Sequence, residues 1–152
     1  MEWKTAVCHQ AEIAIRSTKQ LIESVSEELF SKKIHENKRS LGELIAHIAV
    51  ICEADLHIMK EATAEEMNVF YQRCNVATKE ECLAALEHSF RVFQKELLQA
   101  EDMDHKTTSY WGVTYSRAEW YIEIIAHLYH HRGQLHTYVT VLKQETDVTL
   151  FE

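Results

Sequence analysis

The sequence predicts an all-α fold, a four-helix bundle that residues 1–152 form as a single domain. The chain contains no proline and only three glycines, residues that cost about 3 and about 1 kcal/mol, respectively, inside a helix. Apolar residues recur at the spacings of three and four that mark one face of a helix. Residues able to cap a helix precede most of these runs, and the chain is long enough for one sizeable core.

The first predicted helix covers residues 4–30 and is indicated by its apolar period alone. Its buried face is expected to contain Val7, Ala11, Ala14, Thr18, Leu21 and Val25. The second helix covers residues 41–61 and follows Ser40-Leu-Gly-Glu43. This pattern is a capping box, in which the hydroxyl and the carboxylate each accept a bond from a free N–H group at the helix start.

Two further long helices are predicted in the second half of the chain. The pair Thr78 and Glu81 forms a capping box before residues 79–102, and Ser116 and Glu119 form another before residues 117–143. Four amphipathic helices bury their apolar faces most simply as a bundle, although connections of this length leave the up-down order open.

The connections between the long helices contain two smaller elements. A short extra helix is expected after Thr63-Ala-Glu-Glu66, where it would include Met67, Phe70 and Tyr71. Residues 103–115 mix β-branched and aromatic residues around Gly112, a composition that suits either a small hairpin or an ordered loop.

Composition and charge exclude several classes of function. The formal net charge of −8 argues against nucleic acid as the main partner, because phosphate binding needs a concentrated basic surface. No stretch is long and apolar enough for a membrane span, and the first residues do not resemble a secretory signal, so a cytoplasmic protein is expected. The four cysteines contain no C-x-x-C pair and are expected to be free, mostly buried thiols.

The segment HLYHHRGQLH, residues 127–136, contains four of the ten histidines. On a helical wheel His127 and His131 share the apolar stripe of Trp120 and Ile124, and residues four apart on a helix lie about 6 Å from each other. Two imidazoles so placed can bind one ion. His130 and His136 point away from His131 on the wheel, so both are expected outside the site.

His47 is the candidate for a third ligand, because it lies in the apolar helix LGELIAHIAVICEA. The alternative is a set of hydrogen-bonded core imidazoles without an ion, but each unpaired buried nitrogen would cost about 1–3 kcal/mol. The sequence differs from the metalloprotease helix H-E-x-x-H, since Leu128 follows His127. Three imidazoles with an open fourth position suit zinc, nickel, copper or iron, and we expect one divalent ion, zinc or nickel first.

These residues carry a resemblance to a known family. LGELIAHIA and SRAEWYIEIIAHLYHHRGQL resemble the second and last helices of the DinB/YfiT-like superfamily of bacterial four-helix-bundle proteins, and the H-x-x-H-H-R-G-Q string is the specific part. The resemblance covers nearly the whole chain. It implies that His47, His127 and His131 are the metal ligands. It also implies association with the stress response and a possible homodimer.

Three functions are compatible with this resemblance. Members of known activity are metal-dependent enzymes that use a low-molecular-weight thiol such as bacillithiol, which implies an S-transferase acting on a small electrophile. A metal-dependent hydrolase is the alternative, with Glu43 or Glu123 as the base. A stress-response protein with a purely structural metal is the third. A closed four-ligand site would favour the structural role, and an open site would favour an enzyme.

The sequence also predicts roles for other side chains near the expected metal site. Gln134 is expected to orient a ligand through its amide. Gly133, inside a helix, is expected to mark the close approach of a neighbouring helix. Arg132 is expected to be solvated or salt-bridged. The aromatic residues Trp111, Tyr115 and Trp120 are candidates for the pocket wall or, more simply, for core packing.

Overall fold

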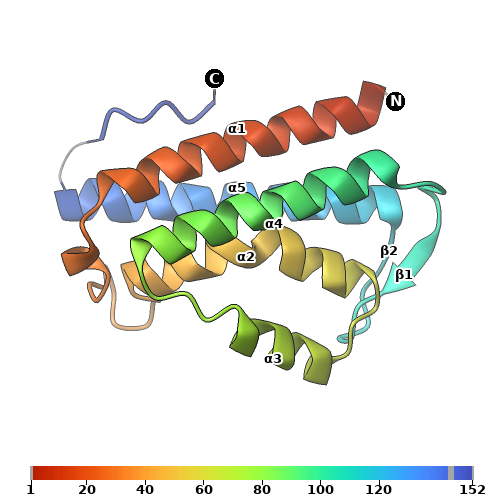
Figure 1. The fold of residues 1–152 in the computed structure, drawn as a ribbon, viewed down its shortest axis with the longest axis horizontal. Coiled ribbons are helices and arrows are strands. Elements are labelled where there is room, and N and C mark those ends of the chain that lie inside the picture. Colours follow the sequence, from red (N-terminus) through yellow and green to blue (C-terminus); the bar gives the residue numbers. More distant parts are fainter. Residues whose placement is uncertain (1, 144–145, 152) are drawn as a thin grey trace.

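The computed structural model describes residues 2–143 and 146–151 and confirms the four-helix bundle (Figure 1). The long helices are α1 (Glu2–Ser24), α2 (Leu41–Met59), α4 (Lys79–Gln99) and α5 (Arg117–Lys143). The smaller elements are the 3₁₀ helix η1 (Glu27–Leu29), the helix α3 (Ala64–Arg73) and the strands β1 (Lys106–Thr108) and β2 (Thr114–Ser116).

The order of packing around the bundle differs from the order along the chain. Both α1 and α2 pack against α4 and α5, so each helix lies between two neighbours. Figure 1 shows that α2 and α4 run in the same direction, because α3 and the segment after it carry the chain back along the outside of α2. Helices α2 and α5 run in opposite directions side by side, and the histidines meet at this contact.

The capping residues begin the helices where the sequence predicts. Capping boxes are present at Ser40–Glu43, Thr63–Glu66 and Thr78–Glu81. At the start of α5, the backbone N–H of Ser116 donates to Glu119 Oε2 at 2.8 Å, while that of Glu119 donates to Ser116 Oγ at 3.3 Å. Each box satisfies N–H groups that the first helical turn leaves without partners.

The first helix is shorter than predicted. It ends at Ser24 rather than residue 30, and Ser26 begins η1 by accepting a bond from the backbone N–H of Glu28. Serine competes well as a helix cap, since its hydroxyl offers the backbone an alternative to the helical bond. Residues 25–40 therefore form an irregular connection around one end of the bundle rather than an extension of α1.

The segment that the sequence left open between hairpin and loop is a hairpin. The strands pair antiparallel with Thr107 opposite Tyr115, and Gly112 in the turn has φ 93°, which an L side chain rarely adopts. Cys8, Cys52 and Cys82 are buried and all four cysteines are free, as expected. In the described part of the chain, no helix has the length and apolar character that a membrane crossing requires.

Candidate metal centre

Three histidine side chains from two helices converge at the contact between α2 and α5. The Nε2 atom of His131 lies 3.1 Å from Nε2 of His47 and 3.0 Å from Nε2 of His127. His47 comes from α2, and the other two occupy successive turns of α5, as their spacing of four predicts. His131 is buried and its two partners are half-buried, so the three rings form the base of a site rather than a surface patch.

The outer nitrogens of two of these rings have partners that fix the tautomer. Asp55 Oδ2 lies 2.7 Å from Nδ1 of His127, and Gln134 Oε1 lies 2.7 Å from Nδ1 of His131. Both partners present an oxygen acceptor, so each Nδ1 carries the proton and each neutral ring exposes a lone pair at Nε2. When both rings are neutral, these two lone pairs face each other across 3.0 Å, and the repulsion is relieved by a proton or a metal cation between them.

The geometry and the donor set fit a divalent metal ion. Zinc–nitrogen bonds of 2.0–2.1 Å in tetrahedral geometry separate two ligand nitrogens by about 3.3 Å, close to the 3.0 and 3.1 Å between these atoms. Among residues 2–143 and 146–151, no further histidine, cysteine or carboxylate joins the group. The protein would therefore supply three ligands to a tetrahedral ion held here and leave the fourth coordination position open.

The electrostatic surroundings keep His47 neutral and therefore able to bind a metal. Burial, reinforced by the charges of Arg39 and the neighbouring histidines, lowers the pKa of His47 to about 3. Burial also lowers the pKa of His131. The hydrogen bond that His127 donates to Asp55 raises the pKa of His127, so this ring is the one at which protons compete with a metal most strongly.

The two glutamates considered as bases differ sharply in the structure. Glu43 is exposed, and its Oε2 accepts a 2.6 Å bond from the backbone N–H of Ser40 as part of the helix cap. Glu123 is half-buried, lies with Asp55 and His127 in a second cluster of potential ligands, and has its pKa raised by burial. Since His127 already donates to Asp55 at 2.7 Å, this cluster orients the ring.

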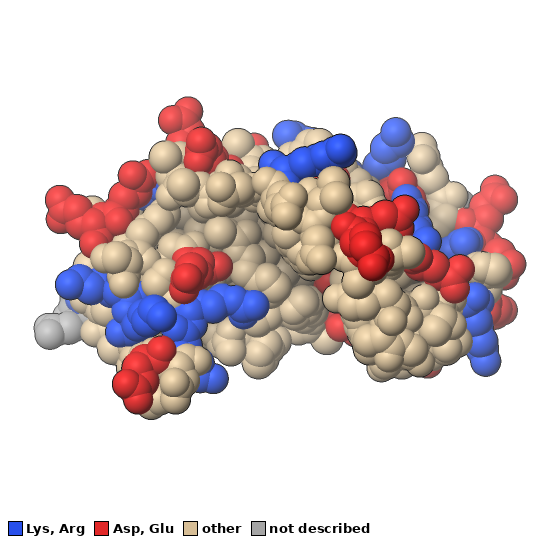
Figure 2. Space-filling model, turned by 90° about the horizontal axis from the view of Figure 1, so that it is seen from below, with Lys and Arg blue, Asp and Glu red and all other residues tan. Residues whose placement is uncertain are grey.

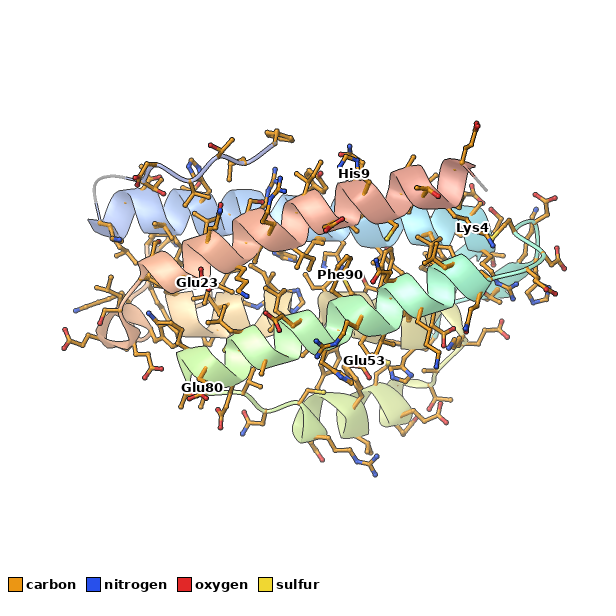
Figure 3. All side chains as sticks on the ribbon, turned by 45° about the horizontal axis from the view of Figure 1, so that its top comes forward. Lys4, His9, Glu23, Glu53, Glu80 and Phe90 are labelled. Carbon is orange, nitrogen blue, oxygen red and sulfur yellow. The ribbon has the colours of Figure 1, made fainter. Side chains whose placement is uncertain are left out.

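The remaining histidines are not part of this group of three, although the ring of His130 lies against that of His131 with centroids 4.9 Å apart. His130 is exposed and His136 is half-exposed. The five others are all exposed, namely His9, His35, His57, His88 and His105. His57 and His88 flank Glu53 on the side of α2 next to α3, and His9 points away from the bundle on α1 (Figure 3).

Three neighbours of the ligand histidines on α5 were also given roles from the sequence, and the structure agrees with one of them. Gln134 orients His131, as predicted. Arg132, expected to be solvated or salt-bridged, is instead buried between the rings of Tyr129 and Phe151, at 4.4 and 4.5 Å, and donates to Ser17 Oγ. Gly133 was expected at a close helix approach, but a Cβ placed there would meet no atom of the described residues within 4 Å.

The aromatic candidates do not form one pocket wall. Trp120 is buried in the core at 2% exposure, whereas Trp111 is 53% exposed in the turn of the hairpin. Tyr115 packs edge-on against Trp120, with ring centroids 4.9 Å apart. Sequence reasoning missed Asp55 and Arg39. Asp55 could have been found from the sequence, because it lies in the largely apolar segment ICEADLH and a buried carboxylate requires a partner.

Comparisons with known proteins agree with the fold. A DinB-family protein from Exiguobacterium sibiricum has a structure that matches at a TM-score of 0.91 with 35% identity, over 99% of both chains. The DinB-like protein YjoA from Bacillus subtilis matches at 0.76 with 19% identity over 97% of both chains. A DinB-like protein from Bacillus cereus matches at 0.71 with 18% identity, over 91% of this chain and 90% of the other.

The sequence comparison identifies the family. No functionally curated protein matches the chain. The sequence model of the DinB family matches residues 7–144, which include both helices that supply the histidines. With this match and the 35% identity to a DinB-family protein over nearly the full length, the chain belongs to the DinB family.

Proposed function

We propose that the protein is a metal-dependent transferase that joins a low-molecular-weight thiol to a small electrophile. The observation that carries this proposal is the convergence of three histidine Nε2 atoms, separated by 3.0 and 3.1 Å, without a fourth ligand among the described residues. An open position favours catalysis over a purely structural metal, because structural sites are normally closed by four protein ligands.

The chain's own residues prepare the site for this chemistry. A divalent ion bound by His47, His127 and His131 would supply Lewis acidity, which lowers the pKa of a thiol that coordinates to it. Asp55 and Gln134 hold the two α5 rings in the tautomer that binds metal. In the transfer, sulfur forms a bond to the electrophilic carbon, the leaving group departs with its electron pair, and the thiol proton passes to solvent.

A metal-dependent hydrolase is the second candidate, and Glu123 is the observation in its favour. Its carboxyl group is half-buried beside Asp55 and His127, and its raised pKa is typical of a group that exchanges protons in catalysis. Glu43 does not support this function, because its carboxylate is committed to the cap of α2. Metal-dependent cleavage of esters, amides or epoxides without added thiol would favour the hydrolase.

The test begins with elemental analysis of protein purified without a histidine tag. We expect about one divalent ion per chain in the wild type, little in His47→Ala and His131→Ala, and an unchanged amount in the control His130→Ala. Thiol transfer to a small electrophile should require the metal and disappear in His131→Ala. Absence of a bound ion after incubation with zinc or nickel, or full turnover in His131→Ala, would contradict the proposal.

A further inference from the structure

A pocket lies between the connection 31–40 and residues 134–138 of α5, and one of its lining residues, Gln134, contacts the histidine cluster. Its volume is about 480 Å³, within the range typical of sites for small molecules. The face seen in Figure 2 is hollowed at its centre, next to a group of basic side chains. The polar side chains that line the pocket are Asn37, Lys38, Arg39, Gln134, Thr137 and Tyr138.

The charge of this region is opposite to that of the whole protein. The chain has a net charge of −8, yet residues 31–40 contain Lys32, Lys33, Lys38 and Arg39 against a single acidic residue, Glu36. Within the described part of the chain, neither Lys38 nor Arg39 forms a salt bridge. Two cationic side chains that line a pocket and form no salt bridge attract an anionic ligand.

The backbone of this connection is fixed against α5. The hydroxyl of Tyr138 donates to the carbonyl oxygen of Arg39 at 2.6 Å. Directly after Arg39, the capping box at Ser40 anchors the chain to the start of α2. Arg39 is therefore held between the two helices that supply the histidines, although its side chain is exposed.

Gln134 connects the pocket to the histidine cluster. The same side chain lines the pocket and accepts the bond from Nδ1 of His131. The pocket and the histidine cluster are therefore separated by no more than the Gln134 side chain and the His131 ring that it contacts.

We infer that this pocket is a subsite for a carboxylate group of the small molecule that reacts at the metal centre. The guanidinium of Arg39 can bind a carboxylate through two parallel hydrogen bonds, and Lys38 adds a second charge. The inference deepens the proposed function and rests on its metal centre. Such a pocket would bind thiols or electrophiles that contain a carboxylate more tightly than neutral ones.

Matched thiols test the subsite in the zinc-loaded protein by isothermal titration calorimetry. 3-Mercaptopropionate should bind about tenfold more tightly than 3-mercaptopropanol, because a hydrogen-bonded charge contributes more than a neutral hydroxyl. The ratio should fall to about one in the double variant Lys38→Gln/Arg39→Gln. The control Lys32→Gln/Lys33→Gln removes the same charge from exposed positions outside the pocket lining, and it should keep the wild-type ratio.

A second arm uses the metal-free protein and succinate, which contains no thiol. Succinate binding that is lost in Lys38→Gln/Arg39→Gln and kept in the control would place the carboxylate site in the chain itself. It would also show that binding of the carboxylate requires neither a thiol nor the metal. If the protein binds zinc but the zinc-loaded protein binds the two thiols with equal affinity, the subsite is overturned and the proposed function still stands.

The experiments also separate failure of the metal centre from failure of the subsite. If no metal binds, the proposed function fails and the succinate titration alone decides the subsite: binding that depends on Lys38 and Arg39 supports it, and no binding overturns it. Binding of inorganic phosphate without any binding of succinate would overturn the carboxylate assignment. Equal losses in the pocket variant and in the control would overturn it too, by assigning the effect to overall charge.

Discussion

At the scale of single residues, the ring of His127 is oriented by a carboxylate from another helix. Asp55 is buried at 6% exposure and lies 2.7 Å from Nδ1 of His127. A carboxylate in this position fixes the tautomer, directs Nε2 toward the other two histidines and increases the basicity of the ring. The arrangement of the candidate metal centre therefore depends on a residue that is not one of its three histidines.

We predict that Asp55→Ala weakens metal binding by about 10–100-fold, the usual cost of removing such a partner. The substitution frees the His127 ring to rotate and to exchange tautomers, so Nε2 no longer points reliably at the other two nitrogens. Competition with a chelator of known affinity measures the change. Glu53→Gln is the matched control, since Glu53 lies on the same helix beside the exposed His57 and His88. Unchanged affinity in Asp55→Ala would refute the orienting role.

The residue scale also shows which parts of the site sequence reasoning can reach. His127 and His131 were predictable as a pair because helical geometry alone places them together. The proximity of Asp55 to His127 is a tertiary contact across 72 positions of the chain, so no local period reveals it. The burial of Arg132 was missed for the same reason, because its contact with Phe151 depends on how the final segment returns to the bundle.

At the scale of elements, the helix starts were predicted well because capping is local chemistry. Each box involves residues three apart, so the sequence contains all of the interacting groups. The interior of α5 was predicted less well. Gly133 was assigned to a close helix contact, but the structure leaves the space next to its Cα open and the residue exposed.

Gly133→Ala is therefore expected to stabilise the protein by about 0.5–1 kcal/mol, the cost of glycine in a helix interior. Urea unfolding measures the change in the free energy of unfolding. Gly42→Ala provides the contrast, since its Cβ would lie 3.0 Å from Cβ of Phe30 and the ring would have to shift. We expect Gly42→Ala to lack this gain. A destabilised Gly133→Ala variant would show that another surface covers this part of α5 in solution.

At the scale of the whole molecule, the packing order of the helices creates the site. Because α2 and α5 are neighbours that run in opposite directions, His47 in the second turn of α2 meets the middle of α5. The sequence predicted the four helices but not this arrangement, since the parallel course of α2 and α4 depends on the path of α3. The histidines of two distant segments thus become part of one buried contact that only the folded protein contains.

This contact links the histidines to global stability, and we predict that the metal-free protein loses stability as the pH falls from about 6.5 toward 4. The pKa of His47 is about 3 in the folded protein against 6.5 for an ordinary histidine, chiefly because the ring is buried. In this range the unfolded chain therefore binds more protons at His47 than the folded chain does, and acid favours unfolding. His131, with its lowered pKa, acts in the same direction, whereas the raised pKa of His127 opposes it.

The variant His47→Gln isolates the first of these contributions, because glutamine does not titrate. Urea unfolding at a series of pH values in the presence of a chelator should give a shallower loss of stability in His47→Gln than in the wild type. The difference in unfolding free energy between the two proteins should consequently narrow, or turn in favour of the variant, as the pH falls through 6.5. His9→Gln, which removes an exposed histidine from α1, should keep the wild-type slope. Parallel pH profiles for the wild type and His47→Gln would mean that His47 is protonated as readily in the folded protein as in the unfolded chain, which is incompatible with a neutral ligand prepared for metal.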